Sequence, residues 1–260
     1  MAGMIITVLG ARGTIGSRLA DQLEERAHDV RRVSRRSGVD ARTGVGLREA
    51  LRGADVAVDC LNHMALRAAT AEDFFRGTAQ HVVRSARSEG VRRLVCVSIA
   101  GAADPAVNRL LGYYRGKAAQ EQVYSTSREA VTIVRSTQWY ELMDDVLRRA
   151  SIGPVSVLPT MTVAALSADR AARHIADEID ASVEDLQDRT LTLRGPQTAT
   201  IREIARTILA ARGSIGGRRP RALVQLPYLG QGIAGGGLVP ADGIVDDLTL
   251  EDWLAAGPSS

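Results

Sequence analysis

The chain has 260 residues, of which 45% are hydrophobic and 24% are charged. This composition is ordinary for a globular protein, and it excludes a disordered chain, a collagen-like repeat and a disulfide scaffold. The 33 basic residues exceed the 30 acidic ones by only three, and all but Lys117 are arginines interleaved with acids along the chain. Because aromatic residues make up only 3% and the arginines form no cluster, we expect no nucleic-acid partner.

No apolar run reaches the roughly 18–20 residues that span a bilayer, and the first residues lack the basic region of a signal peptide. Cys60 and Cys96 lie inside apolar runs, and neither they nor the four histidines show the spacing of metal ligands. We therefore expect a cytoplasmic protein with reduced cysteines, no membrane association and no metal site.

Short apolar segments alternate with helical patterns over most of the chain. The predicted strands are Ile5–Leu9, Asp29–Ser34, Asp55–Cys60, Leu94–Ser98, Val131–Arg135, Val163–Leu166 and Thr190–Leu193. The predicted helices are Ile15–Arg26, Leu47–Arg52, Ala71–Ser88, Tyr113–Thr126 and Ala168–Ile179. Several strands are continuously apolar, as strands covered on both faces should be. The order therefore predicts an α/β fold built on a parallel sheet.

This alternation is interrupted twice, and the two interruptions together predict a small second lobe. The first contains a predicted helix, Gln138–Ala150. Near the C-terminus, Thr200 and Glu203 form the pattern of a capping box before a helix, and Thr249 is placed to cap a last helix that carries Trp253. Between these two helices lies a segment rich in Gly and Pro, residues 213–242, which we expect to be irregular.

The first predicted strand is followed by Gly10, Gly13 and Gly16 and then by an amphipathic helix. Glycines in this order permit a tight turn, let the backbone approach a pyrophosphate and let the helix pack on the strand. The helix N-terminus adds N–H donors for phosphate. Strand, loop and helix together predict a dinucleotide site that also includes Thr14 and Ile15. A glycine-rich turn without a ligand is the alternative.

The second predicted strand runs into Ser34, Arg35 and Arg36, with no acid to hold a ribose 2′-hydroxyl. Arginine forks pair well with phosphate oxygens, so these residues and Arg12 in the glycine loop favour NADPH over NADH. Asp40 is a candidate for hydrogen bonding to the adenine amino group, and an ordinary turn role is its alternative.

A serine, a tyrosine and the only lysine follow in the next part of the chain. Ser98 ends the fourth strand, and Tyr113 and Lys117 stand four residues apart, on one face of a helix. We expect the ammonium to lower the pKa of the phenol from its reference of roughly 10. That shift suits a proton donor to a carbonyl, whose oxygen the serine hydroxyl would orient. These three are our catalytic candidates, with Tyr114 in reserve. Taken singly, each has an ordinary structural interpretation.

A short segment after the fifth strand carries candidates for contact with a substrate. Trp139, Tyr140 and Met143 are positioned to line a pocket there, and core packing explains the same residues equally well.

Three stretches of the chain resemble the atypical, NmrA-like branch of the short-chain dehydrogenase/reductase superfamily. They read LGARGTIG, VRRLVCVSIAGA through YYRGKAAQEQV, and VTIVRSTQWYEL. The later run LTLRGPQTATIREIA is also similar, so the resemblance extends to about residue 212. The chain departs from the family pattern at Arg12, where the loop reads GARG, and at Ser136, where relatives usually have proline.

The resemblance implies a Rossmann-type doubly wound parallel sheet with bound NAD(P) and a small C-terminal substrate lobe. It divides the chain into an NAD(P)-binding domain, 1–136 plus 162–196, and a lobe, 137–161 plus 197–260. By position it assigns Ser98, Tyr113 and Lys117 to catalysis and Lys117 also to the nicotinamide ribose. We expect Leu61, after the third strand, to contact the cofactor as well.

The function that the resemblance implies is NADPH-dependent reduction of a carbonyl in a small molecule, such as a secondary metabolite. Two alternatives stay open: a redox-neutral epimerase or dehydratase, and a regulatory protein that senses NADP without turnover. Neither the substrate nor the oligomeric state follows from these residues.

Overall fold

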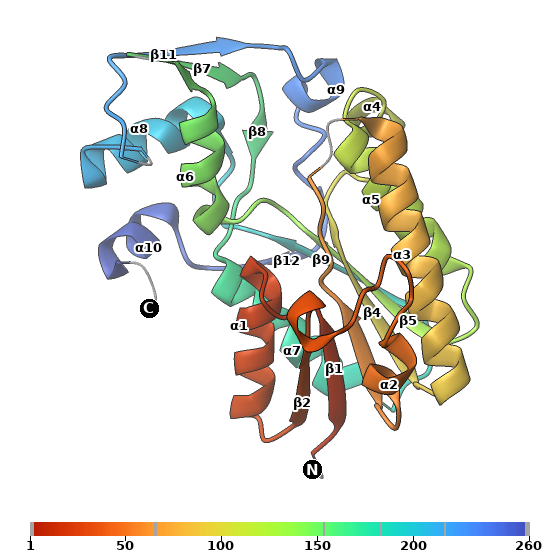
Figure 1. Cartoon of the computed structure of the whole chain (residues 1–260). Helices are drawn as coiled ribbons and strands as arrows, with labels where there is room; N and C mark the ends of the chain where they lie inside the picture. Colours follow the sequence, from red (N-terminus) through yellow and green to blue (C-terminus); the bar gives the residue numbers. More distant parts are fainter. Residues whose placement is uncertain (1–2, 65–66, 153, 183, 216, 258–260) are drawn as a thin grey trace.

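A seven-stranded parallel sheet forms the centre of the computed structural model, which describes residues 3–64, 67–152, 154–182, 184–215 and 217–257 (Figure 1). Its strand order is β12-β9-β5-β4-β3-β1-β2, and all neighbouring strands run parallel. The strands are β1 (Ile5–Leu9), β2 (Asp29–Val33), β3 (Val56–Asp59), β4 (Arg93–Ile99), β5 (Ala130–Ser136), β9 (Arg189–Arg194) and β12 (Ile244–Val245). The chain thus has the predicted Rossmann-like α/β fold.

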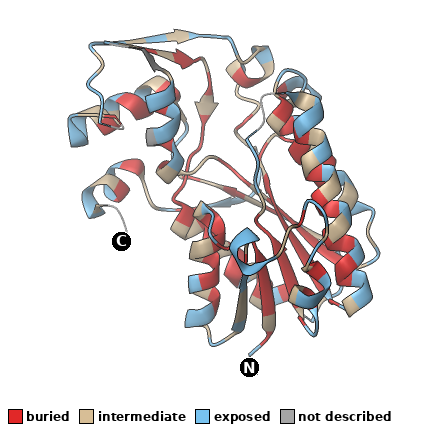
Figure 2. Ribbon diagram, in the orientation of Figure 1, coloured by how far each residue is buried: buried red, intermediate tan, exposed pale blue. Residues whose placement is uncertain are grey.

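Helices cover both faces of this sheet, which explains why its strands are apolar on both sides. On one face lie α1 (Thr14–Glu25) and α7 (Ala168–Ser182), whose apolar side chains pack on Ile6 and Val8 of β1. On the other face lie α2 (Leu47–Leu51), α3 (Ala68–Glu89) and α5 (Gly112–Ser125), which pack on Leu9, Leu94 and their neighbours. Figure 2 shows the buried residues concentrated on the strands and on the sheet-facing sides of these helices.

The sheet places its functional edge between β1 and β3, where the strand order reverses. From β1 the chain moves outward to β2, and it then crosses back to β3 on the other side of β1. In open α/β sheets, ligands bind at the carboxyl ends of the strands beside such a reversal. The loop from Gly10 to Gly13 starts at this edge.

The C-terminal lobe has its own apolar core, which includes Met143, Leu158, Ile204 and Trp253. Its main helices are α6 (Tyr140–Arg149), α8 (Ile201–Arg212) and α10 (Leu250–Ala256). Its short strands are β6 (Ser151–Ile152), β7 (Val155–Pro159) and β11 (Ala222–Leu226), which form one sheet, and β8 (Thr162–Val163) and β10 (Ala199–Thr200), which form another. The lobe stands above the carboxyl ends of the central strands (Figure 1).

Two predicted helix starts in this lobe are confirmed at the level of single hydrogen bonds. The Thr200 and Glu203 side chains cap each other's backbone N–H groups, as a capping box requires. The Thr249 hydroxyl accepts a hydrogen bond from the Asp252 N–H at the start of α10.

The predicted strand Val163–Leu166 is wrong in most of its length. Only Thr162–Val163 forms a strand, and it pairs antiparallel with β10 in the lobe instead of joining the central sheet. The residues after it form backbone hydrogen bonds outside any strand. The Leu166 N–H donates to the Gln138 carbonyl, and the Ala164 carbonyl accepts from the Gly195 N–H. Continuous apolar character therefore marked a buried connection, which sequence alone does not separate from a strand.

The Gly- and Pro-rich segment 213–242 is more ordered than predicted. It contains β11 and the short helix α9 (Gln231–Ala234), which packs on α4 (Pro105–Asn108) beyond the end of β4. A Cβ on Gly232 would lie 2.0 Å from the Ala106 carbonyl oxygen. Glycine is therefore required for this contact. The Gly content of this segment, which is typical of a loop, here allows α9 to pack closely on α4.

Glycine also sets the distance between α3 and α5. A Cβ on Gly112 would lie 2.7 Å from the Ala68 backbone, and one on Gly116 would lie 2.5 Å from the Phe75 ring and 2.9 Å from the Ala71 carbonyl oxygen. The two helices therefore approach closely along this line, which fixes the neighbouring Lys117 against α3.

Within the described ranges, no helix is long and apolar enough to cross a bilayer.

We expect Gly116→Ala to destabilise the fold by about 1–3 kcal/mol, because the added methyl group overpacks the α3–α5 contact. Gly77→Ala, within α3, is the matched control. A Cβ there meets nothing within 4 Å, so the change should stabilise the helix by about 0.5–1 kcal/mol. Urea unfolding of the two variants checks this, and equal midpoints would contradict the close contact.

Candidate cofactor site and active site

The glycine loop has the backbone geometry that a diphosphate site requires. Gly10 has φ +79°, and its N–H donates to the Val33 carbonyl at the end of β2. A Cβ on Gly10 would lie 2.8 Å from the Cys60 carbonyl oxygen, and one on Gly16 would lie 2.4 Å from the Gly10 carbonyl oxygen. Neither position accepts a side chain, so the turn is tight and the first turn of α1 packs directly on it.

The N-terminus of α1 has free hydrogen-bond donors. Its N-cap residue, Gly13, has no side chain to cap the helix, and the first turn has no acidic residue. The N–H groups of Thr14, Ile15 and Gly16 have no partner within the described residues. Donors at the positive end of a helix dipole suit the oxygens of a diphosphate. The residues present therefore fit the cofactor that the sequence predicts.

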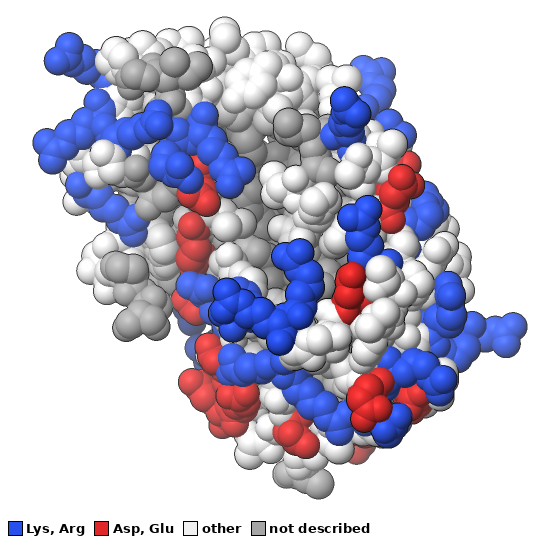
Figure 3. All heavy atoms as spheres, viewed as in Figure 1, with Lys and Arg blue, Asp and Glu red and all other residues white. Residues whose placement is uncertain are grey.

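Unpaired arginines lie beside this cradle. After β2 the chain forms a short 3₁₀ turn, Arg35–Ser37, in which Ser34 and Ser37 cap each other. Across the described part of the chain, Arg12, Arg35 and Arg36 have no ion pair, whereas Arg32 on β2 is bound by two carboxylates. Figure 3 shows basic side chains gathered around the start of α1 and the turn after β2. These three guanidinium groups are available to a phosphate.

Asp40 and Leu61 lie farther along the same edge. The Asp40 carboxylate accepts a hydrogen bond from the Arg42 N–H, and the Asp40 N–H donates to the Val45 carbonyl. This is the turn role that we considered as its alternative, and the adenine contact stays a prediction. Leu61 follows β3, and its N–H donates to Asp59.

Lys117 is buried at the ends of two central strands. Its Nζ donates to the Val97 carbonyl at 2.9 Å, to Gln120 Oε1 at 3.0 Å and to the Leu61 carbonyl at 3.4 Å. It also lies 4.6 Å from the centre of the Phe75 ring. All three of its protons are therefore in use, and burial lowers the pKa of the ammonium. The longest of these bonds is the weakest and the easiest to exchange.

Tyr113 lies one turn before Lys117 on α5, and its hydroxyl has no hydrogen-bond partner among the described residues. The side chain is half-buried, and its ring packs edge-on against Phe75 and Tyr114, with centroids 5.8 Å away in both cases. The surrounding protein removes water from the phenol and raises its pKa to about 12. The expected lowering of this pKa by Lys117 is therefore wrong, because the ammonium bonds to other acceptors and desolvation dominates.

The hydroxyl of Ser98 is already engaged. Its Oγ donates to Glu121 Oε1 at 2.6 Å, and Glu121 in turn accepts from Arg135 at 2.7 Å. Ser98 and Glu121 are both buried. To orient a substrate carbonyl, the serine would first have to leave this charge-assisted hydrogen bond.

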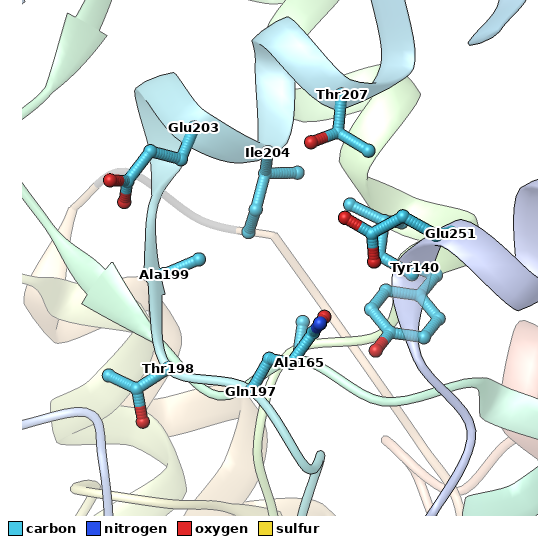
Figure 4. A pocket seen from close by; sticks show the side chains of 10 residues that line it. Tyr140, Ala165, Gln197, Thr198, Ala199, Glu203, Ile204, Thr207 and Glu251 are labelled. Atoms are coloured by element: carbon cyan, nitrogen blue, oxygen red, sulfur yellow. The ribbon is translucent and has the colours of Figure 1, made fainter.

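The three candidate substrate residues point into different surroundings. Trp139 packs against the core beside α1 and donates from Nε1 to Ser136 Oγ. Met143 is buried in the core of the lobe. Tyr140 alone lines a pocket, of about 260 Å³, that α8 and α10 enclose (Figure 4). Side chains of α8, among them Glu203 and Thr207, lie on one side of this pocket, and Tyr140 and Glu251 lie on the other.

Sequence reasoning missed three polar residues near the reserve candidate Tyr114 and near Lys117: the half-buried Gln138 and the buried Asp59 and Gln120. Gln138 Nε2 donates to the Tyr114 hydroxyl at 3.3 Å, whereas its Oε1 is buried without a partner. Asp59 and Gln120 form a hydrogen-bond chain beneath Lys117. The available signal was the charge of Asp59 at the end of an otherwise apolar strand.

Comparison with known proteins agrees with this geometry. The model of a family described as NAD(P)H-binding matches residues 10–145, which is more than half of the chain and includes the glycine loop, Tyr113 and Lys117. The chain therefore belongs to this NAD(P)H-binding family, in agreement with the cofactor class that the resemblance implies. No curated protein matches the sequence.

Solved structures of similar proteins share the whole fold. MoeE5, in complex with UDP-glucose and NAD, has 17% identity and a TM-score of 0.67, with 97% of this chain and 96% of that chain covered. The triphenylmethane reductase of Citrobacter sp., complexed with NADP(H), has 15% identity and a TM-score of 0.65, with 98% and 100% covered. A UDP-glucuronic acid 4-epimerase from Bacillus cereus has 17% identity and a TM-score of 0.67, with 97% of both chains covered.

These three proteins share an architecture, but their names include both a reductase and an epimerase, and their cofactors include both NAD and NADP(H). At such low identity the likeness extends to the fold alone. Binding of NAD(P)H is therefore established for the family of this chain, and the choice between the two cofactors stays a prediction.

We expect Tyr113 to ionise near pH 12, because loss of water around the phenol disfavours the phenolate. The measurement is an ultraviolet titration of the wild type minus the same titration of Tyr113→Phe, which isolates one phenol. A midpoint below the ordinary value of 10.0 would show that a nearby cation, and not burial, controls this group.

Proposed function

We propose that the protein is an NADPH-dependent oxidoreductase that reduces the carbonyl group of a small molecule. The observation that carries this proposal is the unpartnered hydroxyl of Tyr113, one helical turn before the buried Lys117 and at the same sheet edge as the glycine cradle. When bound, NADPH supplies the hydride. The chain must then supply a proton and a fixed geometry.

The proposed proton donor is Tyr113. Like any tyrosine, it carries its proton at neutral pH and is able to donate a hydrogen bond to a carbonyl oxygen, although a pKa raised to about 12 makes it a weaker acid than a free phenol. Phe75 and Tyr114 hold the ring edge-on and limit its movement. Lys117 lies one helical turn away and bonds to Val97 and Gln120, so we assign it to holding the cofactor and not to lowering the pKa of the phenol.

We assign no donor role to Ser98 in the resting arrangement, since Glu121 accepts its proton. If Ser98 orients the substrate oxygen, as the family resemblance implies, the hydroxyl must rotate away from Glu121. The substrate itself we expect between the sheet edge and the lobe, with Trp139, Tyr140 and Met143 shaping that segment by packing.

The proposed preference for NADPH rests on Arg12, Arg35 and Arg36. Their side chains are free of carboxylates within the described residues; Arg12 lies in the glycine loop, and Arg35 and Arg36 follow the end of β2, which bonds to that loop. Guanidinium groups without partners suit a 2′-phosphate, and no acid follows β2 to bind a 2′-hydroxyl. We assign these arginines to the cofactor and expect neither nucleic acid nor membrane as a partner.

A second candidate is a redox-neutral reaction such as epimerisation, because a UDP-glucuronic acid 4-epimerase is among the structurally similar proteins. The two differ in their use of cofactor: a reductase consumes NADPH with each turnover, whereas an epimerase leaves its concentration unchanged. A regulatory protein that senses NADP would bind the cofactor and turn over no substrate.

We expect Arg35→Ala and Arg12→Ala each to weaken NADPH binding by about tenfold or more, because a charge-assisted contact to phosphate is lost. NADH binding should change little. Arg92→Ala is the matched control, since this arginine pairs with Asp55 at the opposite end of the strands. Calorimetric titration of both cofactors measures the effect. Equal losses for NADH and NADPH would remove the argument for a phosphate site.

We expect Tyr113→Phe to lower kcat for carbonyl reduction by about 10²–10⁴-fold, the usual contribution of a general acid. NADPH affinity should stay nearly unchanged, since the cradle is intact. Tyr228→Phe, on an exposed tyrosine of the lobe, is the control. NADPH consumption with a panel of ketones and quinones is the assay. Unchanged turnover in Tyr113→Phe would exclude this residue as proton donor.

A further inference from the structure

A buried carboxylate lies beneath the lysine of the candidate active site. Asp59, at the end of β3, is 1% exposed. Its Oδ2 accepts hydrogen bonds from Gln120 Nε2 and from the Tyr124 hydroxyl, both at 2.8 Å, and its Oδ1 accepts from the Leu61 N–H at 2.9 Å. Both oxygens of this buried carboxylate thus accept hydrogen bonds, as a buried polar group requires.

Gln120 connects this carboxylate to Lys117. Its side chain is fully buried, its Nε2 donates to Asp59, and its Oε1 accepts from Lys117 Nζ at 3.0 Å. An amide has one donor end and one acceptor end. The carboxylate therefore determines that the oxygen, and not the NH₂ group, faces the ammonium.

Lys117 has no carboxylate in direct contact within the described residues. Its other acceptors are the Val97 and Leu61 carbonyls, which are neutral. The nearby Glu121 is bound by Ser98 and Arg135, and the remaining titratable neighbours are the thiols of Cys60 and Cys96. Isolated buried ammonium groups tend to lose their proton. A counter-charge one amide away offsets this tendency.

We propose that Asp59, acting through Gln120, is a positioning residue that keeps Lys117 charged and fixes its ammonium at the carboxyl ends of β3 and β4. The hydrogen-bond chain carboxylate–amide–ammonium is the observation that supports it. What this means for catalysis rests on the proposed function: the ammonium is held in place to bind the nicotinamide ribose, as the family resemblance implies. The Tyr124 hydroxyl donates a second hydrogen bond to the Asp59 oxygen that Gln120 contacts.

The absence of any other lysine makes this testable by nuclear magnetic resonance. Protein labelled with nitrogen-15 lysine gives one side-chain amine signal, that of Lys117. Its pH titration reports directly whether the group is an ammonium, and it needs neither substrate nor cofactor. The test is therefore independent of turnover.

In Asp59→Asn we expect Lys117 to lose its proton at a pH at least about one unit lower than in the wild type, because the counter-charge is gone. The double variant Asp59→Asn, Gln120→Glu places the carboxylate next to the ammonium with little change in volume, so it should restore a titration at high pH. Tyr124→Phe keeps the carboxylate and removes one of its donors. It controls for loss of packing and should shift the titration far less.

Three results would overturn the proposal: an unchanged titration in Asp59→Asn, no recovery in the double variant, or an equal shift in Tyr124→Phe. If Asp59→Asn does not fold, Gln120→Met replaces it: methionine keeps the volume and removes the amide that links the two groups, and a smaller downward shift is expected because the carboxylate remains. NADPH titration of the same samples separates the two hypotheses. If the wild type does not bind NADPH, the proposed function is wrong. The role of Asp59 is decided by the pH titration of the lysine signal alone.

Discussion

Backbone packs directly against backbone wherever this fold brings a functional segment into place, because glycine removes the Cβ that would keep the chains apart. At Gly16 the first turn of α1 rests on the preceding loop, and at Gly116 α5 rests on α3. At Gly232 the lobe rests on α4. These contacts, which no residue but glycine allows, position three features: the glycine loop, helix α5 with Tyr113 and Lys117, and helix α9 of the lobe.

Around these contacts the charged groups divide into two populations. Many arginines at the surface pair with acids, as Arg32 does with Asp21 and Glu24. Beneath the sheet edge, in contrast, Asp59 and Lys117 are buried and separated by one amide. Surface pairs of this kind contribute little to stability, whereas a buried charge without compensation costs much more. The polar chain under Lys117 is thus a strong constraint on which side chains this region accepts.

Most of the central sheet was predictable from sequence because its strands are apolar, short and separated by amphipathic helices. The strand at Ile5–Leu9 and the capping box at Thr200 are present as predicted. The failure at Val163–Leu166 has a clear cause: burial produces an apolar run whether or not the backbone forms a ladder. The expectation that segment 213–242 is irregular was also inaccurate. Glycines occur both in flexible loops and where two backbones pack closely, and the sequence does not distinguish the two.

For the candidate site, sequence identified the residues and missed their protonation and partners. The spacing of Tyr113 and Lys117 predicted one shared helix face, which the structure shows. It did not predict that Val97, Leu61 and Gln120 take up all three lysine protons, or that desolvation governs the phenol. Such effects depend on which groups from distant segments meet at one edge of the sheet, and a linear pattern does not contain that information.

The near-exclusive use of arginine has a consequence for how the molecule responds to alkali. A guanidinium keeps its charge throughout the range in which proteins are handled, whereas an amine does not. Since the one side-chain amine is enclosed at the sheet edge, the side-chain cations at the surface keep their charge as the solution becomes basic. Changes in side-chain charge between neutral and strongly alkaline conditions then originate mainly from the phenols, the two thiols and that single enclosed amine.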